Sequence, residues 1–234
     1  MDAFSIARSQ GWLAEQPRDF QDDLLSRCSV KRFAKNEAVC RVGDPYNGVY
    51  ALVEGVLRLE LAMPDDFRIA STKQPVCWFG QAACLRKKSF LVSLTANTPV
   101  TLLFLPYHEF ERLIGNAAYC KSFALLTVDH YEEAIQALAP LLVCDAQSKV
   151  AGRLAQLAIQ AGPQRPAVLH VAQSDLAEMC GLARVTVFGV LGQLEKRGLI
   201  ETGYRRITVF DPEALVGFGT AALAQGAVPS SSAA

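Results

Sequence analysis

QSDLAEMCGLARVTVFGVLGQL, residues 173–194, is the stretch that decides the fold. Its apolar residues recur at helical spacing on both sides of Gly181, so two short helices joined by a tight turn are expected. Ala177 is small where the two helices must cross closely, and Gly181 supplies a left-handed backbone conformation at the turn. The second helix is expected to pack back on the first through Val187 and Val190. This spacing indicates a helix-turn-helix.

The residues after this motif predict a wing. Gly198 ends the second helix, and β-type segments at 199–202 and 206–210 flank a Gly-Tyr-Arg turn. The formal net charge is zero, with 23 basic and 23 acidic residues, so a DNA-binding surface must be a local patch. The residues predicted to contact double-stranded DNA are Gln173, Ser174, Arg184, Val185, Thr186, Phe188, Gly189, Gln193, Lys196, Arg197, Arg205 and Arg206.

The N-terminal half has a β-type pattern. Over 57–61, leucines alternate with charged residues, as in a strand with one face buried. Many short strands separated by Gly, Pro, Asn and Asp turns are typical of an antiparallel roll or barrel. The predicted strands are Val49–Val53, Val56–Leu61, Arg68–Thr72, Phe90–Ala96 and Val100–Leu105.

After Pro106 the pattern becomes helical, with a short helix at 107–114 and a long one at 117–142. One apolar stripe of the long helix has the a/d spacing of a coiled coil, which predicts a homodimer. The alternative is that this stripe packs on the chain's own β-domain. The stripe consists of Ala124, Val128, Tyr131, Ile135, Leu138 and Leu142.

Another helix is expected from Asp145, as N-cap, to the breaker Ala161-Gly162-Pro163. The fold class is therefore α+β: a jelly-roll-like antiparallel β-roll, a long dimerisation helix and a C-terminal winged helix-turn-helix. The predicted domains are an effector-sensing β-roll at 1–116, the dimerisation helix at 117–143, the DNA-binding domain at 144–224 and a disordered tail at 225–234.

The seven cysteines occur singly, without a CxxC pair, so reduced and mostly buried thiols are expected. The N-terminus does not have the pattern of a signal peptide, and no apolar run reaches the roughly 18 residues of a membrane span. A cytoplasmic protein without a membrane partner is expected. No nucleophile–base pair, metal-ligand spacing or phosphate loop indicates an enzyme.

Four blocks of the sequence resemble the CRP/FNR family of bacterial transcription regulators, over roughly 30–215. The resemblance implies a homodimer, a ligand pocket beside the long helix, a hinge near Asp145, and RNA polymerase as a partner. The four blocks are RFAKNEAVCRVGDPYNGVYALVEGVLRLEL, WFGQ, PLLVCDAQSKVAGRLAQLA and SDLAEMCGLARVTV.

The chain departs from the members that bind cyclic AMP. They hold the cyclic phosphate with an acidic residue after the FG turn and with an Arg-Ser pair, but Gln81, Phe90 and Leu91 stand at these positions. An anion without charged partners would be costly to bury, so cyclic AMP is not the expected effector. The predicted pocket favours an apolar ligand or is filled by its own side chains, and it comprises Gly80, Gln81, Ala82, Phe90, Leu91, Tyr131, Ala134 and Ile135.

The cysteine and histidine pattern bears on two metal cofactors. An iron–sulfur sensor needs an N-terminal cysteine cluster, and the first forty residues hold only Cys28 and Cys40. Haem stays an open hypothesis, with candidate axial ligands at His108, His130, Cys77 or Cys84.

The recognition helix departs from the family as well. The usual Arg-Glu-Thr-Val-x-Arg reads Arg-Val-Thr-Val-Phe-Gly at 184–189. Arg184 can still pair with guanine and Val185 can contact a thymine methyl, which predicts a different operator. The alternative is a ligand-binding or protein-interaction module with a degenerate DNA reader.

Overall fold

The computed structural model forms two compact units, Met1–Glu132 and Glu133–Ala234. It describes residues 2–64, 66–142, 145–162 and 164–217, without the side chains of 139–142. The long helix α5 (Ala117–Leu142) contributes to both units. The predicted border at 143–144 and the predicted tail lie outside the described residues, so the domain limits stay predictions.

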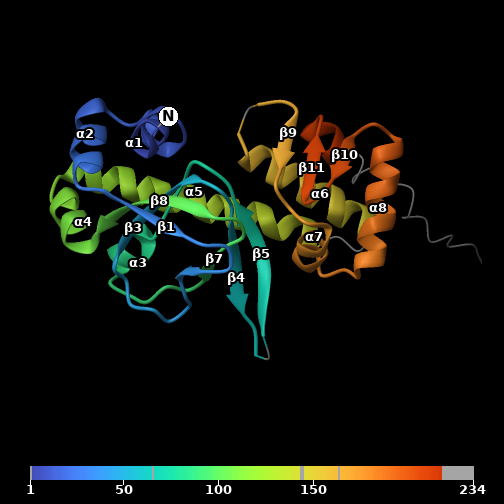
Figure 1. The fold of residues 1–234 in the computed structure, drawn as a ribbon, viewed down its shortest axis with the longest axis horizontal. Helices are drawn as coiled ribbons and strands as arrows, with labels where there is room; N and C mark the ends of the chain where they lie inside the picture. The colour runs from blue at the N-terminus through green and yellow to red at the C-terminus, as the bar shows by residue number, and fades with distance from the viewer. Residues whose placement is uncertain (1, 65, 143–144, 163, 218–234) are drawn as a thin grey trace, which may run out of the picture. The chain divides into compact units, whose positions relative to one another are not determined.

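Unit 1 contains two four-stranded antiparallel sheets (Figure 1). The first has the order β1-β8-β3-β6 and the second the order β2-β7-β4-β5. The strands are β1 (Ser29–Phe33), β2 (Ala38–Cys40), β3 (Gly48–Glu54), β4 (Leu57–Ala62), β5 (Phe67–Lys73), β6 (Cys77–Phe79), β7 (Ser93–Ala96) and β8 (Val100–Pro106).

Strand β3 is buried on both faces and supplies both cores of unit 1. Val49, Ala51 and Val53 join a core formed with the helices. Tyr50 and Leu52 point the other way, into a core formed by residues of both sheets. The period of two in a strand explains this division. An uninterrupted apolar run therefore marks the centre of the roll.

Helices cover the outer side of the first sheet. Trp12, Phe20, Trp78 and Phe123 form an aromatic cluster, in which the rings of Trp12 and Trp78 lie 5.7 Å apart. The sequence analysis did not predict the helices before residue 29. The helical elements of unit 1 before α5 are α1 (Ala3–Ser9), η1 (Trp12–Glu15), α2 (Arg18–Ser26), α3 (Gln81–Arg86) and α4 (Tyr107–Ile114).

Two strand predictions need correction. The predicted strand 90–96 begins only at Ser93, because Phe90 bonds to the loop around Gly43 and Asp44 instead of to a neighbouring strand. The alternation in β4 also fails to keep one face buried: Leu57 is buried but Leu61 is exposed. Near the tip of the β4–β5 hairpin, Met63 and Phe67 are exposed as well, so this part of the hairpin lies outside the buried core.

Unit 2 contains the predicted DNA-binding elements. Helix α6 (Ala146–Gln160) is capped as expected, since Asp145 Oδ1 accepts a hydrogen bond from the backbone N–H of Ser148 at 2.7 Å. Strand β9 (Ala167–Leu169) pairs with β11 (Arg206–Val209), which pairs with β10 (Ile200–Gly203). Among the described residues, no helix combines the length and apolarity needed to cross a bilayer.

Candidate DNA interface and effector turn

The helix-turn-helix consists of α7 (Gln173–Cys180) and α8 (Arg184–Lys196). Gly181 ends α7 with φ +63°, and the N–H of Leu182 donates to the carbonyl of Ala177 at 3.0 Å. Ala177 is buried, as its small size predicted. The turn therefore has the left-handed conformation that glycine adopts at little cost.

The inward face of α8 anchors it to the rest of unit 2. Val187, Val190, Leu191 and Leu194 are buried, and α8 packs against α6 and α7. The remaining face points to solvent. Every predicted DNA-contacting residue on α8 lies on this exposed face: Arg184, Val185, Thr186, Phe188, Gly189, Gln193 and Lys196.

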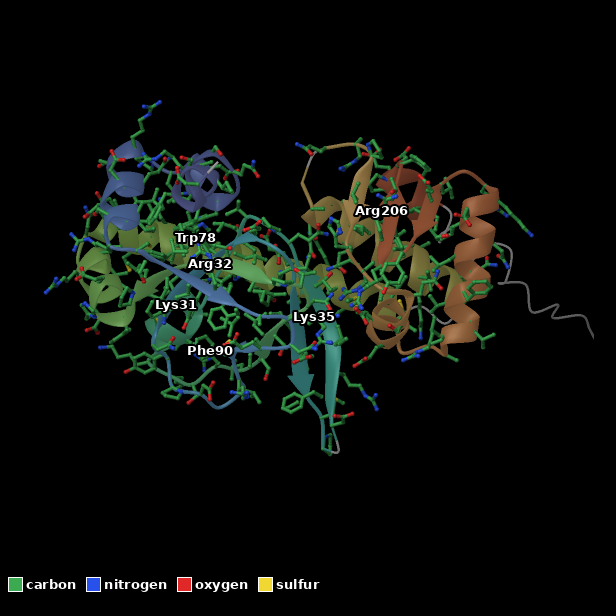
Figure 2. The ribbon with its side chains drawn as sticks, in the orientation of Figure 1. Lys31, Arg32, Lys35, Trp78, Phe90 and Arg206 are labelled. Atoms are coloured by element: carbon green, nitrogen blue, oxygen red, sulfur yellow. The ribbon has the colours of Figure 1, made fainter. Side chains whose placement is uncertain are left out.

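The wing is joined to the recognition helix by hydrogen bonds. Glu195 Oε1 accepts from both the backbone N–H and the hydroxyl of Thr202, at 2.9 and 3.0 Å. The backbone N–H of Thr202 lowers the pKa of Glu195, so the carboxylate is charged at neutral pH. The wing turn presents exposed Arg205 and Arg206, the second of which is labelled in Figure 2.

The other predicted contacts differ in their exposure and in their hydrogen bonds. Gln173 and Ser174 begin α7 and are half-buried, while Arg197 is exposed just after α8. Gln193 accepts a hydrogen bond from Gln147, a residue of α6 that the sequence analysis did not single out. Gln147 is a half-buried polar residue outside any apolar pattern, so no sequence signal indicated its role.

The predicted effector turn begins helix α3. Gly80 precedes it with φ +97°, and a Cβ there would lie 2.7 Å from the carbonyl oxygen of Gly48. Gln81 is 1% exposed, and its Nε2 lies 3.1 Å from Nδ1 of His130 on α5. Its Oε1 accepts no hydrogen bond from the described residues. Ala82 follows, half-buried. The turn is thus tied to the long helix through a neutral amide.

Phe90 and Leu91, predicted together, have opposite environments. Phe90, which is labelled in Figure 2, is 6% exposed. It belongs to the core between the sheets, together with Tyr50, Phe79 and Leu94. Leu91 is 69% exposed and lines no interior site. These residues do not fit a cyclic phosphate: a buried phenyl ring and an exposed leucine offer an anion neither charge nor hydrogen bonds.

Of the α5 stripe residues in unit 1, Val128 and Tyr131 are exposed, whereas Phe123 faces the aromatic core. The alternative that the stripe packs on the chain's own β-roll is therefore wrong for these two residues. Ile135 and Leu138, in unit 2, are exposed as well. Ala124 and Ala134 are also exposed, and the side chain of Leu142 is outside the described residues. Ala134 and Ile135 belong to unit 2 and the turn at Gly80 belongs to unit 1, so this part of the predicted pocket stays a prediction.

The six described cysteines are free thiols, three buried and three half-buried, so fewer are fully buried than expected. Burial raises the pKa of Cys28, Cys40 and Cys84 to about 12, which keeps them protonated. Cys144 lies outside the described residues. Of the haem candidates, His108 is exposed beside Glu109, and the described residues contain no group of three metal-ligating side chains.

Comparisons with known proteins agree with this architecture. Residues 30–117 match the cyclic nucleotide-binding domain, and residues 148–218 match the Crp-like helix-turn-helix domain. The transcriptional regulator LdrP of Thermus thermophilus is 27% identical over 192 residues, which cover 80% of this chain and 94% of LdrP. The HTH-type transcriptional regulator Cmr of Mycobacterium tuberculosis is 26% identical, covering 90% of this chain and 85% of Cmr.

A solved structure shows the same fold. FixK2 from Bradyrhizobium japonicum superposes with a TM-score of 0.72 at 19% identity, covering 82% of this chain and 96% of that chain. A cyclic nucleotide-binding fold followed by a Crp-like helix-turn-helix defines a transcription regulator that binds DNA. The chain belongs to the CRP/FNR family.

Proposed function

We propose that this regulator works as a homodimer, reads its operator with α8 and the wing, and does not respond to cyclic AMP. The observation that carries the proposal is the exposed face of α8, where residues predicted to read bases adjoin the basic wing. RNA polymerase is the partner implied for a regulator of this family, acting in the bacterial cytoplasm.

The exposed stripe on α5 supports the homodimer. Val128, Tyr131 and Ile135 are large apolar side chains repeated along one helix face with no cover in the single chain. A second copy of the same helix would bury them by two-fold symmetry. Two reading heads would then lie about 34 Å apart, one helical turn along the duplex.

The dimer is tested by Ile135→Asp, with Ile159→Asp as the matched control. Both isoleucines are about half exposed, but Ile159 lies on α6 and is not a member of the stripe. A carboxylate facing its symmetry mate in a dry interface costs several kcal/mol. Light scattering should show a monomer for Ile135→Asp and a dimer for Ile159→Asp. A dimer in both would remove the stripe from the interface.

DNA reading is tested on a duplex selected from a random library by the full-length protein, with fluorescence anisotropy at two salt concentrations. Arg184→Ala should weaken binding by about 1–3 kcal/mol and relax base preference. Arg205→Ala should weaken all sequences alike and reduce the salt slope by about one. Moving one half-site by about five base pairs should abolish tight binding.

A second candidate function is the protein-interaction module, favoured by the exposed Val185 and Phe188 on α8. That function predicts no sequence preference in the selection, and equal binding of the original and shifted duplexes.

A further inference from the structure

The solvent face of α8 has an apolar centre. Val185 is 77% exposed and Phe188 is 66% exposed, and they lie three positions apart, so they are neighbours on one helix face. Gly189 and Gly192 continue the same stripe at four and seven residues from Val185. A Cβ added at either glycine would meet no atom within 4 Å.

Packing inside unit 2 does not explain this stripe. The helix already has a complete buried face in Val187, Val190, Leu191 and Leu194, on the opposite side. Solvent-facing helix positions are usually polar or charged, and glycine in a helix interior is unfavourable. Two large apolar side chains and two unneeded glycines together indicate that another molecule contacts this face.

The charges around the stripe indicate what that molecule is. Arg184 and Lys196 are exposed near the two ends of α8, and Arg205 and Arg206 are exposed on the wing, which also carries the exposed Glu201. The described acidic side chain of α8 is Glu195, which is bonded to Thr202. Exposed basic side chains suit phosphates. In the major groove, the apolar group available to an apolar centre is the 5-methyl group of a pyrimidine.

We propose that Val185 and Phe188 read pyrimidine 5-methyl groups, so that part of the operator's specificity comes from apolar contacts. This inference rests on the proposed function, because it requires α8 to enter the major groove. The shared chemistry is the 5-methyl group of thymine or of 5-methylcytosine. Arg184, at the start of the helix, would add hydrogen bonds to a guanine edge.

The test removes the methyl and nothing else. In the duplex selected by the full-length protein, each thymine is replaced in turn by deoxyuridine, which keeps every hydrogen-bonding group. At the contacted positions the Kd should rise about threefold to fivefold for each methyl, as burial of one such group predicts. Replacing the same T·A pair by 5-methylcytosine·guanine and by cytosine·guanine distinguishes the two methyl sources.

Variants connect the effect to the two side chains. With Phe188→Ala or Val185→Ala, the deoxyuridine penalty at the matching position should fall to about onefold, as in a double-mutant cycle. Phe188→Leu should keep part of the deoxyuridine penalty. Ile159→Ala, a similarly exposed apolar residue on α6, should keep all of it. Circular dichroism and dimer mass confirm folding, which exposed positions should not disturb.

The outcomes separate this inference from the proposed function. If a sequence is selected but deoxyuridine is tolerated everywhere, methyl reading is wrong while DNA reading stands. If the penalty persists in both alanine variants, other residues read the methyl. If no duplex is selected, the proposed function itself fails and the stripe is a surface for a protein. A penalty that disappears with the side chain supports the inference.

Discussion

Phe90 in the β-roll and Phe188 on the recognition helix are both phenylalanines at predicted contact positions, yet their environments are opposite. Phe90 is packed between two sheets, beside Tyr50 and Phe79. Phe188 has two thirds of its surface in solvent. The same residue type therefore fills an interior in one unit and is exposed to solvent in the other. Burial, and not residue type, distinguishes the two.

The largest expected effect comes from truncating the two rings. Phe90→Ala should lower the free energy of unfolding by about 3–5 kcal/mol, because it leaves a cavity in a core. Phe188→Ala should change it by less than about 0.5 kcal/mol, because the ring is exposed. Urea denaturation at a fixed protein concentration measures both, with Leu91→Ala as an exposed neighbour of Phe90. Equal losses in the free energy of unfolding for Phe90→Ala and Phe188→Ala would contradict the difference in their burial.

A smaller effect is expected at Gly189. Gly189→Ala should raise the free energy of unfolding by up to about 1 kcal/mol, since alanine favours a helix and its Cβ meets nothing. The same variant should weaken binding to the selected operator, because the added methyl stands where the helix backbone approaches DNA. Thermal unfolding and anisotropy give the two numbers. A stabilised variant with unchanged DNA affinity would place Gly189 outside the interface.

No effect at all is expected from cyclic nucleotides. A ligand present at a hundred times its Kd adds about 2.7 kcal/mol of stability, which a melting curve detects readily. With Phe90 filling the roll, millimolar cyclic AMP or cyclic GMP should leave the Tm unchanged. A saturable rise in Tm would show that the effector turn binds the nucleotide despite Gln81 and Phe90.

Local signals predicted the elements of unit 2 well. The turn at Gly181 and the cap at Asp145 depend on backbone conformation and on a hydrogen bond within a few residues. Both can be recognised from neighbours in the sequence. The long helix 117–142 was predicted with its observed bounds, because its apolar residues recur at helical spacing over many turns.

The sequence was less informative where distant contacts decide. Trp12 and Phe20 fix the N-terminal helices by packing on Phe123, more than a hundred residues away. Phe90 and Leu91 are adjacent apolar residues, and their sequence does not show which one is buried. The backbone of Phe90 is hydrogen-bonded to Gly43 and Asp44, residues more than forty positions earlier in the chain. For the candidate DNA interface, the sequence predicted that Val187 packs inward and that Phe188 faces outward, and the structure has both environments. The DNA contacts themselves stay a prediction.

The hydrogen bonds between Glu195 and Thr202 have a thermodynamic consequence for the wing. Because the carboxylate holds both the amide and the hydroxyl of Thr202, the hairpin is ordered before it meets a partner. The hairpin loses its conformational entropy during folding and not during association. The entropic cost of binding is therefore smaller, and more of the contact energy appears as affinity. The benefit would appear mainly as a longer residence time of the complex. Since the folded pKa of Glu195 is lowered, this ordering is complete at neutral pH and is lost as acid protonates the carboxylate.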